Sequence, residues 1–198
     1  MAGQKEARPS LGAMDGQKTG CGEAYTSHRI TQTQPTVKPQ FHELIQEELS
    51  ELAAYDQWVA WIWGPIDPKT GKPRKIPINP HDGENGSSTD PGTWGTVQQA
   101  LDAMERLNLP GVGFVLSEDD PFFALDVDDC LSGDPGPVLE IIEKMNTYTE
   151  RSPSKKGLRL IGRGKMPEWS KNKTGNFEAY DKKRFVTITG DVYGGFGL

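Results

Sequence analysis

The sequence has few cysteines and histidines, and it lacks long apolar runs. Its two cysteines, Cys21 and Cys130, lie far apart, so they cannot form a four-ligand zinc site alone and are weak grounds for a secreted, disulfide-based fold. The three histidines, His28, His42 and His81, show no metal-ligand spacing. No apolar run approaches the roughly 18 residues of a membrane span, and the N-terminus lacks the apolar stretch of a secretory signal. We therefore expect a cytoplasmic protein with no membrane partner.

The length and composition favour one globular domain preceded by a tail. The chain has 198 residues, of which 34% are hydrophobic, with 23 glycines and 15 prolines. Residues 1–40 are rich in Gly, Gln, Thr and Lys with almost no apolar periodicity, so they cannot bury enough surface to offset the entropy of ordering. We expect a disordered tail over 1–40 and a folded domain over 41–198.

The net charge of −6 argues against nucleic acid as a partner, but the distribution of charge is uneven. Residues 116–150 contain ten acids and one base, whereas residues 151–173 contain eight bases and one acid. An acidic block beside a basic block suits a site that holds metal cations against polyphosphate. Two solvated faces of opposite sign explain the same pattern, and charge alone favours that simpler interpretation.

Apolar periodicity predicts an α+β fold, with flanking helices on a mostly antiparallel sheet. Helices are expected at 41–52, 96–107 and 137–147. Strands are expected in three pairs that are close in sequence, 58–63 with 75–79, 112–117 with 122–128, and 177–180 with 185–189, together with a strand at 158–161.

The segment FFALDVDDC, residues 122–130, is the first candidate for chemistry. Side chains alternate along a strand, so Phe123, Leu125 and Val127 should face the core while Asp126 and Asp128 project together from the other face. Two such carboxylates can hold two metal ions, and their oxygens suit Mg²⁺ or Mn²⁺. An exposed acidic strand end is the alternative. The neighbouring Asp129 should point away and act as a structural cap.

Two further segments carry charged residues next to strands. In SPSKKGLRLIGRG, residues 152–164, a polar turn offers hydroxyls, ammonium groups and backbone N–H groups to phosphate, and Arg159 should face the side of the sheet that carries the aspartates. In NFEAYDKKRFVTITG, residues 176–190, Glu178 could add a third carboxylate. Taken singly, an ordinary basic turn and an edge-strand glutamate are the simpler interpretations.

Together the three segments resemble the primase-polymerase domain of phage and plasmid replication proteins, within the archaeo-eukaryotic primase superfamily. The resemblance rests on ALDVDDC, SPSKKGLRL and FEAYDKKRFVTITG in this order, with weaker likeness upstream, and it covers about residues 55–190. It implies an RRM-like catalytic core and template-directed nucleotidyl transfer with two Mg²⁺ or Mn²⁺ ions. The implied partners are single-stranded DNA template and primer, (deoxy)nucleoside triphosphates, and a separate replicative helicase.

The resemblance also implies roles for individual residues. Asp126, Asp128 and Glu178 would be the catalytic metal ligands, with Asp181 as a competitor for the third position. The candidates for nucleotide contact are Ser154, Lys156, Arg159, Tyr180 and Arg184. The candidates for contact with the nucleic-acid backbone, in a hairpin that could equally be a solvated turn, are Lys72, Arg74 and Lys75.

The sequence departs from the family pattern in two places. Arg159 stands where many members carry histidine, and arginine cannot act as a neutral hydrogen-bond partner or proton donor. Lys155 stands where glycine is frequent, which predicts a less tight turn. The chain also has no Walker-type GxxxxGK[ST] motif, so we expect no motor within it and interpret it as a stand-alone domain or a truncated piece.

Two other functions are compatible with the motifs. Arg159 and the short C-terminal region motivate a catalytically impaired module that binds nucleic acid in replication. A sugar-nucleotide transferase also uses Asp-x-Asp to hold a metal diphosphate, but the Rossmann-like alternation of strands and helices is missing here.

Overall fold

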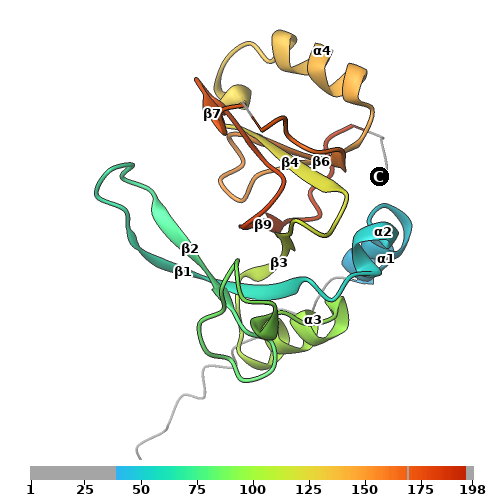
Figure 1. Cartoon of the computed structure of the whole chain (residues 1–198). Helices are drawn as coiled ribbons and strands as arrows, with labels where there is room; N and C mark the ends of the chain where they lie inside the picture. The colour runs from blue at the N-terminus through green and yellow to red at the C-terminus, as the bar shows by residue number, and fades with distance from the viewer. Residues whose placement is uncertain (1–38, 169, 195–198) are drawn as a thin grey trace, which may run out of the picture. The chain divides into compact units, whose positions relative to one another are not determined.

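A computed structural model describes residues 39–168 and 170–194 (Figure 1). The expected tail at 1–40 therefore lies almost entirely outside the described residues, as do Cys21 and His28. The α+β class is confirmed, and every paired strand in the described part is antiparallel. The strands form two sheets rather than one, and the RRM-like core remains a prediction.

The first sheet has four strands in the order β2-β1-β3-β9. Their bounds are β1 Trp58–Ile66, β2 Pro73–Ile78, β3 Gly111–Leu116 and β9 Arg184–Ile188. The turn signal at 67–71 joins β1 to β2, so the expected first hairpin is confirmed. This hairpin extends beyond the rest of its sheet (Figure 1).

The second sheet has five strands in the order β5-β6-β4-β8-β7. Their bounds are β4 Phe122–Val127, β5 Tyr148–Arg151, β6 Leu158–Arg163, β7 Lys173–Thr174 and β8 Phe177–Tyr180. The sequence did not predict β5 or β7. The acidic strand β4 lies at the centre of this sheet, between β6 and β8, which brings the other two motifs to its two sides.

Local features of the sequence explain where two of the helices begin or end. Their bounds are α1 Pro39–Glu47, α2 Ser50–Ala53, α3 Val97–Arg106 and α4 Gly136–Met145, with 3₁₀ turns at Pro91–Thr93 and Cys130–Ser132. The single helix expected at 41–52 is divided in two, because Leu49 leaves the helical conformation at φ −125°. Helix α3 begins with a capping box, in which Thr96 and Gln99 each accept a hydrogen bond from the other's backbone N–H.

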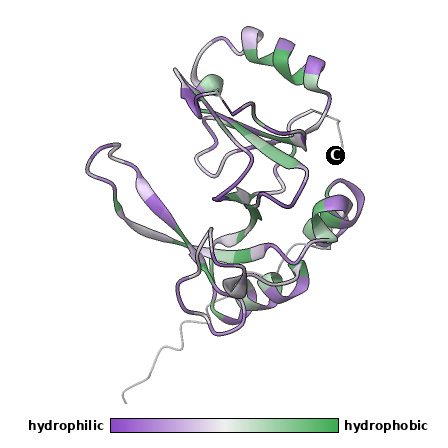
Figure 2. Cartoon of the chain, viewed as in Figure 1, coloured by the Kyte–Doolittle hydropathy of each residue, from purple (hydrophilic) through white to green (hydrophobic). Residues whose placement is uncertain are grey.

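Two apolar clusters hold the domain together. The larger contains Trp58 and Phe114 of the first sheet with Phe122 and Ile161 of the second, all without measurable exposure. The smaller packs Val127, Leu158 and Leu160 beneath α4, and Leu125 joins it. Figure 2 shows β3 and β4 largely hydrophobic and a hydrophilic stretch on β2. Leu125 and Val127 thus face the smaller cluster, as expected, but Phe123 joins neither cluster, and the Asp126 face of β4 carries Phe122 and Ala124 of the larger one.

Two expected hairpins are wrong. Strands β3 and β4 belong to different sheets, because the turn between them is organised by the buried Asp120. Its carboxylate accepts hydrogen bonds from the backbone N–H groups of Ser117 and Phe122 and from the side chain of Gln57. Strands β8 and β9 are separated in the same way, since β8 pairs with β4 and β9 with β3.

The turn before β6 packs closely against the end of β4. A Cβ added at Gly157 would lie 2.6 Å from the carbonyl oxygen of Val127 and 3.3 Å from Cα of Asp128. Because backbone atoms cannot rotate aside, we expect Gly157→Ala to lower the free energy of unfolding by about 1–3 kcal/mol in urea denaturation. The exposed neighbour variant Lys156→Ala should stay within about 0.5 kcal/mol of the native chain. Equal stability of the two variants would contradict this account.

Candidate active site

A row of charged residues crosses the whole second sheet. Cross-strand pairing places Glu150 of β5 opposite Arg159 of β6, Arg159 opposite Asp126 of β4, Asp126 opposite Glu178 of β8, and Glu178 opposite Lys173 of β7. Directly paired residues share one face of a sheet and have neighbouring Cβ atoms. The predicted proximity of Asp126, Glu178 and Arg159 is therefore confirmed. We call these five residues the charged row.

Arg159 is the buried centre of the charged row. It is 5% exposed, and its Nε and Nη2 donate to the two carboxylate oxygens of Asp126 at 2.7 and 3.1 Å. Its Nη1 donates to the hydroxyl of Thr187 on β9 at 2.6 Å and to the backbone carbonyl of the same residue. Burial alone lowers the pKa of a guanidinium, but the Asp126 carboxylate more than offsets this and raises the pKa of Arg159. Arg159 is thus a fixed cation joining the two sheets.

Glu150, at one end of the row, is completely buried. One carboxylate oxygen accepts hydrogen bonds from the Tyr148 hydroxyl at 2.9 Å and from the backbone N–H groups of Thr189 and Gly190 at 2.8 and 3.1 Å. Among the described residues, its other oxygen has no hydrogen-bond partner. Burial raises the pKa of Glu150, and the nearby Arg159 only partly opposes this.

Glu178 organises the other end of the row. It accepts hydrogen bonds from Lys173 and, at 2.7 Å, from the Tyr180 hydroxyl. The hydrogen bond from Lys173 lowers the pKa of Glu178, so the carboxylate is charged at neutral pH. Burial and Glu178 together raise the pKa of Tyr180 to about 12. The guanidinium of Arg184 lies 4.5 Å from the centre of the Tyr180 ring, so these candidate residues form one contiguous group.

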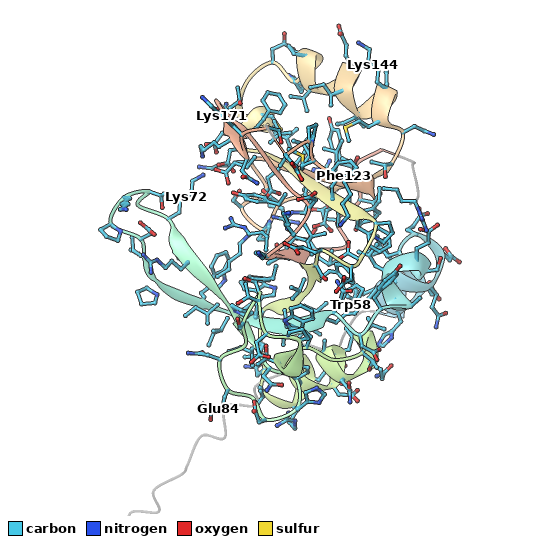
Figure 3. All side chains as sticks on the ribbon, in the orientation of Figure 1. Trp58, Lys72, Glu84, Phe123, Lys144 and Lys171 are labelled. Carbon is cyan, nitrogen blue, oxygen red and sulfur yellow. The ribbon has the colours of Figure 1, made fainter. Side chains whose placement is uncertain are left out.

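The β1–β2 hairpin lies beside the charged row. Lys72 extends from it toward the second sheet (Figure 3), with Nζ 3.3 Å from a carboxylate oxygen of Asp128, the residue after β4. Lys75 is half-buried, with Nζ 3.4 Å from the Thr187 hydroxyl. Burial and the nearby Arg159 lower the pKa of Lys75 to about 8. Arg74 instead pairs with Asp67 at 2.9 Å, on the hairpin itself.

The polar turn at 152–157 adjoins the end of β4 through Gly157, but its side chains point elsewhere. Ser154 shares a 3.1 Å hydrogen bond with Ser152, and Lys156 is exposed. Within the described part of the chain, neither forms a hydrogen bond or ion pair with the three candidate carboxylates. Lys155 takes the left-handed conformation at φ 61°, so the turn keeps a backbone shape that usually calls for glycine. The expectation of a less tight turn is wrong.

Two further aspartates that the sequence singled out, Asp181 and Asp129, lie outside the charged row. Asp181 is buried, and its carboxylate accepts a 2.9 Å hydrogen bond from the backbone N–H of Met166. Asp129 precedes the 3₁₀ turn at Cys130–Ser132 in a left-handed conformation, but its side chain makes no capping hydrogen bond. Asp129 thus occupies the expected cap position, but it caps the turn through its backbone carbonyl, which accepts a hydrogen bond from Ser132. Cys130 is a half-buried free thiol, and burial raises its pKa.

The donor chemistry of the site suits a hard divalent cation. Over residues 39–168 and 170–194, no three His, Cys, Asp or Glu side chains already converge as ligands of one ion. A carboxylate nevertheless has about four lone-pair sites, so the two hydrogen bonds from Arg159 leave Asp126 with accepting capacity. Its cross-strand neighbour Glu178 and the half-exposed Asp128 add oxygens of the kind that Mg²⁺ and Mn²⁺ prefer.

Three members of this site were missed by the sequence analysis. Glu150 was overlooked because β5 was not predicted: YTER has no apolar alternation, and its first three residues are all buried. Lys173 lies on the two-residue strand β7, which is too short to give any periodic signal. Thr187 could have been found, because it alternates with buried Val186 and Ile188 in the motif that was quoted.

The raised pKa of Glu150 predicts a pH dependence of stability. A carboxyl group that binds its proton more tightly when folded stabilises the fold below its usual pKa of 4.5, and this contribution is lost as pH rises toward the folded value. Glu150→Gln keeps an oxygen acceptor without titrating. We therefore expect the melting temperature of Glu150→Gln, relative to the native chain, to increase from pH 5 to pH 8.

The exposed Glu140 on α4 offers a matched control. The melting temperature of Glu140→Gln should follow that of the native chain across the same pH range. A constant difference between Glu150→Gln and the native chain would show that the buried carboxyl does not titrate as argued.

Comparisons with known proteins agree with the motifs. No family model matches the chain. A DNA primase-polymerase from Nitratiruptor phage NrS-1 is 36% identical over 156 residues, which cover 74% of this chain and 21% of that protein. The chain thus spans about a fifth of the length of the relative it matches. No helix among the described residues is both long and apolar enough to cross a membrane. Because this identity extends over most of the chain, the protein belongs to the primase-polymerase domain family.

Proposed function

We propose that the chain is a nucleotidyltransferase domain that extends a primer along a single-stranded DNA template in phage- or plasmid-type replication. The observation that carries the proposal is the charged row, in which Asp126 and Glu178 are direct cross-strand neighbours beside a fixed arginine. The phage relative is itself named a DNA primase-polymerase. Template and primer DNA with nucleoside triphosphates are the substrates that we propose for this chain.

Asp126, Asp128 and Glu178 would hold one or two Mg²⁺ or Mn²⁺ ions. Such ions stabilise the negative charge that develops on the attacking and leaving oxygens of phosphoryl transfer. The lowered pKa of Glu178 keeps this carboxylate ionised as such binding requires. Arg159 orients Asp126 through two hydrogen bonds, so Asp126 enters the site with its rotamer already fixed.

The cations around the row would receive the triphosphate. Arg159 has four of its hydrogen bonds committed to Asp126 and Thr187, so we assign it the role of positioning residue. Lys75 forms a 3.4 Å hydrogen bond with Thr187, and its ammonium group would contact the phosphates of the DNA strand rather than the nucleotide. Ser154, Lys156 and Arg184 are exposed and complete the proposed nucleotide contacts. The protein would supply alignment and charge, without covalent chemistry.

The commitment of Arg159 also favours a second candidate function. If a nucleotide requires a free group at this position, the domain would bind nucleic acid in replication, together with a separate helicase, without joining nucleotides. Salt-sensitive binding of single-stranded DNA with no incorporation of labelled nucleotide in Mg²⁺ or Mn²⁺ would identify this function.

Primer extension separates the two functions. Asp126→Ala and Asp126→Asn should be inactive, but they also leave Arg159 buried without its partner, which costs about 3–5 kcal/mol of stability. Asp128→Asn and Glu178→Gln are cleaner tests because their partners Lys72 and Lys173 are exposed, so the loss of either ion pair leaves no buried charge behind. We expect both to remain folded and to lose extension by on the order of 100-fold or more.

The control is Asp119→Asn, which removes an exposed carboxylate outside the row. It should extend primers like the native chain. Normal extension by folded Asp128→Asn and Glu178→Gln proteins would refute the proposed carboxylate site.

A further inference from the structure

Apolar side chains are exposed along the outer half of β1. Four large hydrophobic residues are exposed in the described part of the chain, Ile62, Trp63, Ile66 and Leu107, and three of them lie on this strand. Trp63 is the largest of these side chains, with 43% of its surface exposed. Successive side chains of a strand face opposite sides, so Ile62 and Trp63 lie on different faces of β1, and Trp63 is the exposed aromatic residue on the face that carries Lys75.

Trp63 is held rigidly by its neighbours. It pairs across the hairpin with Lys75, and it shares a face of β1 with Trp61. The two indole rings meet edge to face, with centroids 4.8 Å apart at 90°, and Trp61 is only 4% exposed. The ammonium group of Lys75 lies 6.0 Å from the Trp61 ring centre and 5.9 Å from that of Trp63. We call these three residues the hairpin face.

The hairpin carries positive charge in a chain that is acidic overall. Residues 58–78 contain four bases and one acid, whereas the whole chain has a net charge of −6. Lys72 and Lys75 extend from this hairpin to Asp128 and Thr187, beside the charged row. A surface that combines an exposed indole with several cations complements a strand that alternates bases with phosphates.

We propose that the hairpin face binds single-stranded DNA by stacking a base on Trp63, while Lys72 and Lys75 neutralise the adjacent phosphates. Stacking on an aromatic ring tolerates any base, because every base has a π face. The phosphate contacts would fix the position of the strand beside the charged row. The inference rests on the proposed function, since it names the surface that leads the template to that site.

The test measures binding of a fluorescently labelled oligothymidylate to the whole chain, by anisotropy, without metal or nucleotide. Trp63→Ala should weaken binding roughly tenfold, within the range that loss of one stacked base produces. Trp63→Tyr should restore most of the affinity, because an aromatic ring suffices for stacking. Lys72→Gln should instead reduce the dependence of affinity on salt concentration.

Leu107→Ala is the matched control, since it removes a large side chain that is 37% exposed outside the hairpin. It should bind the oligonucleotide like the native chain. An unchanged affinity in folded Trp63→Ala would overturn the proposal, as would an effect of Trp63→Ala on self-association alone.

The same assay separates this inference from the proposed function. Glu178→Gln, whose partners Lys173 and Tyr180 lie outside the hairpin, should bind the oligonucleotide with nearly native affinity while failing in primer extension. If binding depends on Trp63 but the chain does not extend primers, the hairpin face is supported and the nucleotidyltransferase assignment is refuted. If the chain extends primers but its binding of the oligonucleotide does not depend on Trp63, the hairpin face is refuted and the nucleotidyltransferase assignment is supported.

Discussion

The burial of one guanidinium constrains the whole site. Arg159 cannot lose its proton, so a position that is 5% exposed is tolerable only if its donors find acceptors. Asp126 and Thr187 supply them from β4 and β9, which belong to different sheets. The same interactions therefore fix the central carboxylate, join the sheets, and bring the hairpin lysines to the edge of the charged row. The chemistry that we propose depends on this one network.

Charge in the site is arranged in layers of decreasing burial. Glu150 and Arg159 are buried, Asp126 and Glu178 are partly exposed, and Lys72 and residues 154–156 of the polar turn are exposed. Buried members act on their neighbours strongly because little water screens them, whereas exposed members can exchange partners freely. A site of this kind keeps its geometry without substrate and still offers accessible groups to a polyanion. The half-buried Lys75 lies at the boundary, which explains its lowered pKa.

Local elements could be predicted from the sequence, and long-range pairing could not. The strand at β4, the alternation that separates Asp126 from Leu125 and Val127, and the helix after Thr96 all follow from periodicity and capping. The separation of β3 from β4 depends on the buried Asp120, whose partner Gln57 lies 63 residues away. Arg159 was expected to face the carboxylates, and it does, but its hydrogen bonds to Thr187 depend on β9, which belongs to the first sheet and not to the sheet of Arg159. Glu150 and Lys173 lie on strands too short for pattern recognition.

The separation of neighbouring strands into different sheets has a consequence for how the chain folds as it is synthesised. Strand β3 must wait for β9, and β4 must wait for β8, so each sheet stays incomplete until the last strands have left the ribosome. Such late closure gives a high contact order and keeps apolar strand edges unpaired for longer. The edge of β3 that faces β9 therefore stays unpaired until residue 188 has left the ribosome, whereas β1 already has both of its neighbours.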